Sequence, residues 1–141
     1  MAPGLLLRIG ADGGVEAASA YLALLDLAAM PGGADATTRI AGNLGLRLGV
    51  VGAAGPLPSL AAAPRATLQA DCSVLAGAQG LATPPLALLQ GLARDLAAEG
   101  RPLRPGEHVA LLGPAAPLAP RPGETWRLSI EGLAPVAVTF R

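Results

Sequence analysis

The segment from residue 84 onward constrains the fold of this chain most. Residues 84–99 open with two prolines, which the first turn of a helix tolerates, and Gly100 follows as a stop signal. Thr83 can cap the start of this helix. The leucines with helical spacing, expected to form one apolar stripe, are Leu86, Leu89, Leu92 and Leu96. We therefore predict a helix at about 84–99 that packs on a sheet through one face.

Short apolar segments separated by Gly and Pro predict β-strands on both sides of this helix. Residues 108–113, 125–130 and 135–140 follow it, and a Gly-containing loop joins the last two as in a β-hairpin. Near the N-terminus, residues 4–9 have the pattern of a strand, and the Asp-Gly-Gly sequence at 12–14 supplies a tight turn. The sequence therefore predicts an α+β, mostly β fold with one main packed helix.

The middle of the chain holds three further apolar segments. Residues 17–30 suit either a helix or a buried strand, because Ala and Leu favour helix while a continuous apolar run also fits a strand. Residues 44–50 alternate apolar residues with glycine and arginine, which predicts a strand with a buried apolar side and with Arg47 facing solvent or a partner. Residues 66–76 are predicted to form one strand, with Cys72 as a small residue on its core face.

The core must be built from small aliphatic side chains. Hydrophobic residues make up 52% of the chain, but its aromatic residues are only Tyr21, Trp126 and Phe140. Each alanine buries little area, so at about 25 cal/mol per Å² such a core stabilises less than one rich in Phe or Ile. A length of 141 residues suits one domain. We expect a single domain over residues 1–141 that gains stability by associating with another chain.

Charge and cysteine content exclude several classes of function. Ten arginines balance ten acidic residues without long runs of either sign, so nucleic acid and membrane surfaces are not expected partners. The chain has no lysine, which excludes a Schiff-base amine. Its single cysteine cannot form an internal disulfide, and no run of about twenty apolar residues is free of Pro, Gly or charge. These features predict a cytoplasmic protein.

The order of motifs carries a resemblance to a known enzyme family. The segments PPLALLQGLARDLAAEGRPLRPGEHVALLG and PRPGETWRLSIEGLAPVAVTF keep a family pattern of a proline-led helix, an L..G..VL.G strand and a GD.V...F.GLG.V.V.F hairpin. Residues 40–43 (IAGN) and 48–49 (LG) look like its upstream ADN...LG region. On these motifs the chain resembles the C-terminal half of the 2-keto-4-pentenoate hydratases, in the fumarylacetoacetate hydrolase-like superfamily, as a shortened and degenerate member.

The resemblance implies a mixed β-roll, usually oligomeric, in which carboxylates hold Mg²⁺ or Mn²⁺ and the metal binds a 2-keto acid. Oxygen ligands suit such ions, and Lewis-acid polarisation of the keto group assists hydration or decarboxylation. The resemblance also places the family's paired glutamates before the part matched here and its third ligand at Leu24 or Leu25. Asp26 is one or two places away and is a metal ligand only if the register slips.

The other polar positions of that family favour binding over catalysis. Gly42 replaces an aspartate of the family and the family's lysine has no counterpart, whereas an asparagine is kept. No catalytic residue is assigned, and no cofactor is expected unless another chain completes the site. The residues expected to bind a small carboxylate are Asn43, Arg47 and Gln79.

The single histidine is interpreted as structural. An imidazole can act as an acid, a base or a ligand near neutral pH. Glu107 precedes His108, but adjacent residues on a strand point to opposite faces, so the two side chains should not share a site.

Three functions from different classes fit these residues. The favoured one is a hydratase-like protein without the metal site, acting as a non-catalytic binding or accessory subunit. The second is a metal-dependent hydratase or decarboxylase of 2-keto acids whose active site is completed by a partner chain. The third is a structural oligomerisation domain. The expected partners are copies of this chain or a hydratase- or decarboxylase-like chain.

Overall fold

The protein is mostly β, with eight strands and one helix in its described parts. The computed structural model describes residues 1–26, 35, 45–55, 62, 64–71, 73–77, 84–113 and 118–141. Its elements are β1 (Ala2–Ile9), β2 (Val15–Leu25), β3 (Leu46–Val51), β4 (Ala66–Ala70), β5 (Ser73–Gly77), α2 (Pro85–Ala98), β6 (His108–Leu112), β7 (Thr125–Ile130) and β8 (Val136–Thr139). The predicted α+β, mostly β fold is confirmed. The described helix is too short to cross a membrane.

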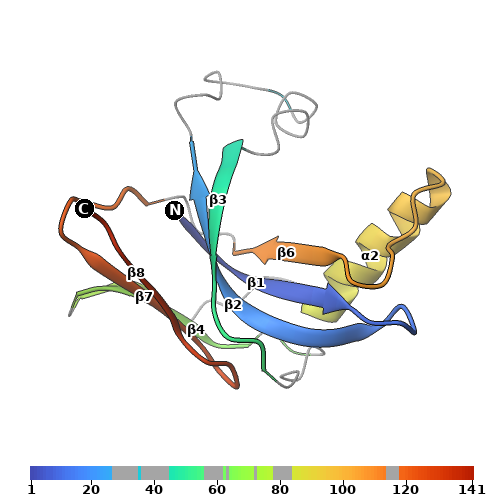
Figure 1. Cartoon of the computed structure of the whole chain (residues 1–141), viewed down its shortest axis with the longest axis horizontal. Coiled ribbons are helices and arrows are strands. Elements are labelled where there is room, and N and C mark those ends of the chain that lie inside the picture. The colour runs from blue at the N-terminus through green and yellow to red at the C-terminus, as the bar shows by residue number, and fades with distance from the viewer. Residues whose placement is uncertain are drawn as a thin grey trace.

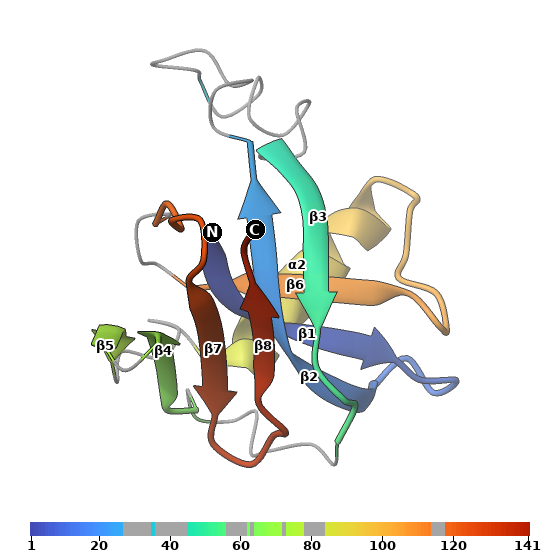
Figure 2. The same cartoon turned by 60° about the vertical axis from the view of Figure 1, so that its left-hand side comes forward.

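Two four-stranded sheets pack against each other, as Figures 1 and 2 show. The first sheet has the order β3-β2-β1-β6 and the second the order β5-β4-β7-β8. Every strand pair within the described residues is antiparallel. The helix α2 contacts the first sheet at β6 and runs outward from it (Figure 1). Both termini lie near one another on the same side of the molecule (Figure 2).

The main core lies between the two sheets. Alternate residues of β1, including the fully buried Leu7 and Ile9, meet Trp126 and Leu128 of β7, and Leu89 of α2 joins them. A second, smaller cluster of Ala2, Tyr21 and Ala23 lies apart from this core. Strand β2 contributes to both clusters and is buried from residue 18 to residue 23. Burial on both faces removes the polar alternation of a strand, which explains why the part of residues 17–30 that lies in β2 shows no clear period; residues 27–30 lie outside the described residues.

The prediction of one strand over residues 66–76 is wrong. The segment forms two antiparallel strands, β4 and β5, separated by a turn at Asp71. Asp71 has a φ of 49°, a left-handed conformation that Asp tolerates better than most residues. Its carboxylate Oδ1 accepts a hydrogen bond of 3.0 Å from the Thr125 amide, which holds the turn against β7. Val74 on β5 is 60% exposed. Cys72, the residue expected on the core face, lies outside the described residues.

The helix is confirmed, but its predicted apolar stripe is only partly buried. It begins after Pro84, without a side-chain cap in the described residues, and Gly100 follows it with a φ of 74°. Of the four expected leucines Leu89 is buried and Leu96 half-buried, whereas Leu86 and Leu92 are exposed. Thr83 lies outside the described residues.

A similar departure occurs in β3, an edge strand of the first sheet. Leu48, expected on the buried side, is 67% exposed. Val50 of the same strand packs against the main core, whereas the open end of the β2–β3 hairpin projects beyond the second sheet in Figure 1.

Two turns of identical sequence, Arg-Pro-Gly-Glu, open β6 and β7 at residues 104–107 and 121–124. In each turn the glutamate amide donates to the arginine carbonyl, at 3.1 and 3.2 Å, and the arginine amide donates back to the glutamate Oε2, at 2.8 and 2.9 Å. The glycines have φ of 85° and 89°, and the proline precedes them, as in a type II turn. Sequence analysis did not single out this repeat.

Candidate functional site

The end of the β2–β3 hairpin carries the ion pair of Asp26 and Arg47. Asp26 directly follows β2, and its amide donates a 2.8 Å hydrogen bond to the carbonyl of Gly45, just before β3. Arg47 lies on β3, and its Nη2 and Nε reach the same Asp26 oxygen at 3.2 and 3.3 Å. The hairpin register therefore brings together two charges that are far apart in the sequence. The Asp26 side chain is 32% exposed and that of Arg47 is 69% exposed, so solvent screens the pair.

The three residues predicted to bind a carboxylate are not all described. Asn43 and Gln79 lie outside the described residues, so their part in a pocket stays a prediction. Arg47 is exposed, as expected, but its guanidinium already contacts a carboxylate of its own chain. A ligand carboxylate at Arg47 would have to share that guanidinium or displace Asp26.

The described residues do not fit a divalent metal ion. Every Asp, Glu and His of the sequence is described, and no three of them gather closely enough to hold a metal. Leu24 and Leu25, at the positions of the implied third ligand, end β2 and offer no side-chain oxygen. At Asp26 the neighbouring guanidinium repels a cation, and one carboxylate supplies few of the oxygen ligands that Mg²⁺ or Ca²⁺ requires.

An apolar cluster lies near this ion pair on the same hairpin. The ring of Tyr21 on β2 sits directly over Gly49 of β3, where any larger side chain would collide with it. Leu25 and Leu46 pack against the cluster that contains Tyr21. The surroundings of the implied metal position are therefore mainly aliphatic and aromatic in the described residues.

His108 begins β6 and is exposed, opposite Arg8 of β1. The carboxylate of Glu107 turns instead to the amide of Arg104. Glu107 therefore belongs to the turn before β6 rather than to the strand, and His108 belongs to no metal-binding group within the described residues.

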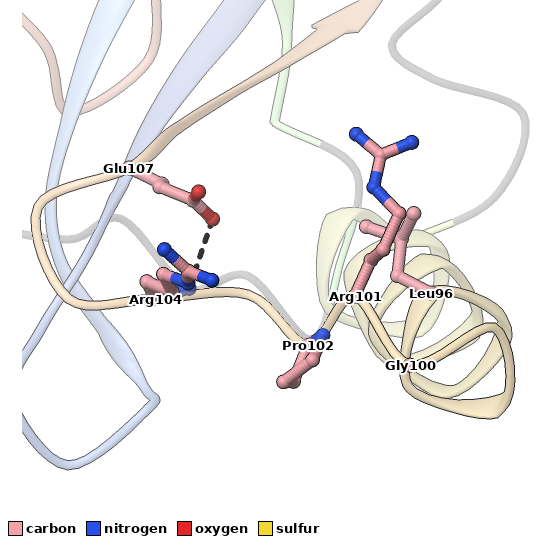
Figure 3. A pocket seen from close by; sticks show the side chains of 6 residues that line it. All are labelled: Leu96, Gly100, Arg101, Pro102, Arg104 and Glu107. Carbon is pink, nitrogen blue, oxygen red and sulfur yellow. Dashed lines mark hydrogen bonds between the residues drawn. The ribbon is translucent and has the colours of Figure 1, made fainter.

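A pocket of about 310 Å³ lies between the end of α2 and the loop that leads into β6 (Figure 3). Its lining residues are Leu96, Gly100, Arg101, Pro102, Arg104 and Glu107. This site was not predicted from the sequence, although two arginines and a glutamate within seven residues were a visible signal. The pocket is distinct from the Asp26–Arg47 pair, since it involves α2 and β6 rather than the β2–β3 hairpin.

Sequence comparison with protein-family models and with curated proteins gives no match. Comparison of the structure does give matches. Two structures of 4-oxalocrotonate decarboxylase from Pseudomonas putida G7 align with TM-scores of 0.74 and 0.72 at 15% sequence identity. This chain has the fold of the aligned part of that decarboxylase. At 15% identity the likeness shows the fold alone, and this is the fold expected from the sequence.

The alignments cover 99% of this chain and 59% of each decarboxylase chain, so the chain spans about three-fifths of their length. One of the decarboxylase structures is complexed with magnesium and adipate, and the other with calcium and acetate. The fold therefore accommodates divalent cations in those proteins.

Proposed function

We propose that this chain is a non-catalytic relative of the 2-keto acid hydratases and decarboxylases, acting as a binding or accessory subunit without a metal. One observation carries the proposal: the carboxylate nearest to the implied metal position, Asp26, is bound by Arg47. The scattered positions of the other described acidic residues support it.

Simple electrostatics explains why this ion pair opposes metal binding. A divalent cation at Asp26 would lie a few ångströms from the Arg47 guanidinium. At about 4 Å in water, two unit charges interact by about 1 kcal/mol, and a double charge doubles this repulsion. A metal that took the same oxygen, Oδ2, would also have to break both hydrogen bonds from the guanidinium. A single carboxylate does not compensate for either loss.

A second candidate is a metal-dependent hydratase or decarboxylase whose active site is completed by a partner chain. It is supported by the metals in the two decarboxylase structures. On this proposal, a partner's carboxylates would draw Arg47 away and leave Asp26 for the metal.

The test is calorimetric titration of Mg²⁺ or Mn²⁺ into the whole chain with oxalate or pyruvate present. We expect no saturable heat from the original chain and none from Asp26→Asn. Saturable binding below millimolar that is lost in Asp26→Asn would overturn the non-catalytic proposal. Glu16→Gln is the matched control, because Glu16 also forms an exposed ion pair, with Arg8 at 3.7 Å.

The proposal includes a cytoplasmic location and association with copies of this chain or with a hydratase- or decarboxylase-like chain. The single cysteine and the aliphatic core support these expectations. Light scattering after size-exclusion chromatography measures the number of copies, and a monomer at micromolar concentration contradicts self-association.

A further inference from the structure

The pocket at the end of α2 concentrates unpaired positive charge. Arg101 lies at the helix end beside the half-buried Leu96, while Arg104 and Glu107 lie across the pocket on the loop (Figure 3). Within the described residues, neither guanidinium has a carboxylate within ion-pair distance. The charges of Arg101, Arg104 and Glu107 add up to one positive charge, so the pocket suits an anion with one negative charge.

The backbone around this pocket is held in place from both sides. At the helix end, the Arg101 amide donates to the carbonyl of Leu96 at 2.8 Å. On the loop, the amide of Gly106 donates to the Ile9 carbonyl at 2.8 Å, and the Ile9 amide donates back to the carbonyl of Glu107 at 2.9 Å. These hydrogen bonds hold the loop against the end of β1. Binding of a ligand in the pocket therefore requires little further ordering of the loop backbone.

Comparison with the second Arg-Pro-Gly-Glu turn, at residues 121–124, shows that the carboxylate of Glu107 can accept a further hydrogen bond. At Glu124, Oε2 accepts both the amide of Arg121 and the indole Nε1 of Trp126, each at 2.9 Å. At Glu107, Oε2 accepts the amide of Arg104, but Val109 stands where the tryptophan would be and offers no donor. The Glu107 carboxylate therefore retains acceptor capacity that faces the pocket.

We propose that this pocket binds a small hydroxycarboxylate. Its carboxylate lies between the guanidinium groups of Arg101 and Arg104, whose forked N–H groups match carboxylate oxygens. Its hydroxyl donates to Glu107, and its carbon chain contacts Leu96. The site contains none of the residues implied in metal binding, so it stands or fails independently of the proposed function.

The test is an NMR titration of the whole ¹⁵N-labelled chain, in buffer with a chelator, with sodium glycolate and with sodium acetate at constant ionic strength. These probes differ by one hydroxyl. We expect saturable shifts centred on residues 100–107, with a dissociation constant in the millimolar range for glycolate and about tenfold weaker binding of acetate. Equal affinities for the two probes, or shifts that are unsaturable and scattered over the surface, would overturn the proposal.

Three variants assign the roles. Glu107→Gln still offers an oxygen to the Arg104 amide, so the turn is kept. Loss of the negative charge should strengthen acetate binding, while the preference for glycolate should fall because a neutral amide oxygen is a weaker acceptor than a carboxylate. Replacing Arg101 and Arg104 together by Ala should weaken both probes at least tenfold. Arg94→Ala is the matched control, an exposed arginine of the same helix outside the pocket, and should bind as the original does. A double variant that binds glycolate as well as the control contradicts the site.

Discussion

Adding one methyl group at Gly4 should destabilise the protein strongly, because β1 is paired on both sides there. A Cβ on Gly4 would stand 2.5 Å from the backbone oxygen of Leu111 and 2.9 Å from the Leu112 side chain on β6. The first contact is with backbone, so relief requires β1 and β6 to move apart. Overpacking of this kind costs about 1–3 kcal/mol. At about 4 °C per kcal/mol for a chain of this size, Gly4→Ala should lower Tm by about 4–12 °C.

The same substitution at Gly91 should have the opposite sign. Gly91 lies inside α2, where an added Cβ meets nothing within 4 Å, and Ala is favoured over Gly in a helix by about 0.5–1 kcal/mol. Urea unfolding followed by the fluorescence of Trp126, the single tryptophan and a fully buried one, measures both variants. Equal stability of the original chain and Gly4→Ala, with Gly91→Ala folded as expected, would refute the pairing of β1 with β6 at this position.

Two further predictions concern stability. The hydrogen bonds from the Arg121 amide and the Trp126 indole lower the pKa of Glu124, so its contribution is present above the ordinary pKa of about 4.5 and is lost as pH falls through the lower folded value. Glu124→Gln should therefore lower the urea midpoint at pH 7, and the difference from the original chain should shrink in acid; a difference independent of pH contradicts this. Leu7→Ala should cost about 2–5 kcal/mol and Leu48→Ala less than about 0.5 kcal/mol, because Leu7 is fully buried and Leu48 largely exposed; similar urea midpoints for the two would contradict the assigned faces.

The elements that could be predicted from the sequence are those with a strong local signal. The helix after Pro84 has prolines at its start and a glycine at its end, and the β7–β8 hairpin has apolar segments around a short loop. Both are confirmed. The break at Asp71 was hidden because the residues around it continue the alternating pattern of a strand. An aspartate in a left-handed turn leaves no periodic signal that separates it from a polar strand residue.

Exposure and long-range pairing were harder to predict. Leu48 and Leu92 have the spacing of buried residues but are exposed, because periodicity marks the apolar side of an element and not whether another element covers it. The bond of Arg47 to Asp26 depends on the register of β2 against β3, which periodicity does not specify. The charged residues of the pocket beside Arg101 are visible in the sequence, but the turn that brings them together could not be predicted from it.

The central claim, that Asp26 serves an ion pair rather than a metal, is tested most directly by electron paramagnetic resonance of Mn²⁺. The hexaaqua ion gives a signal that falls when the ion is bound by protein. We predict that Mn²⁺, titrated with oxalate present, gives the same signal strength with the original whole chain as with Asp26→Asn. A saturable fall in the signal with the original chain, absent with Asp26→Asn, would contradict it.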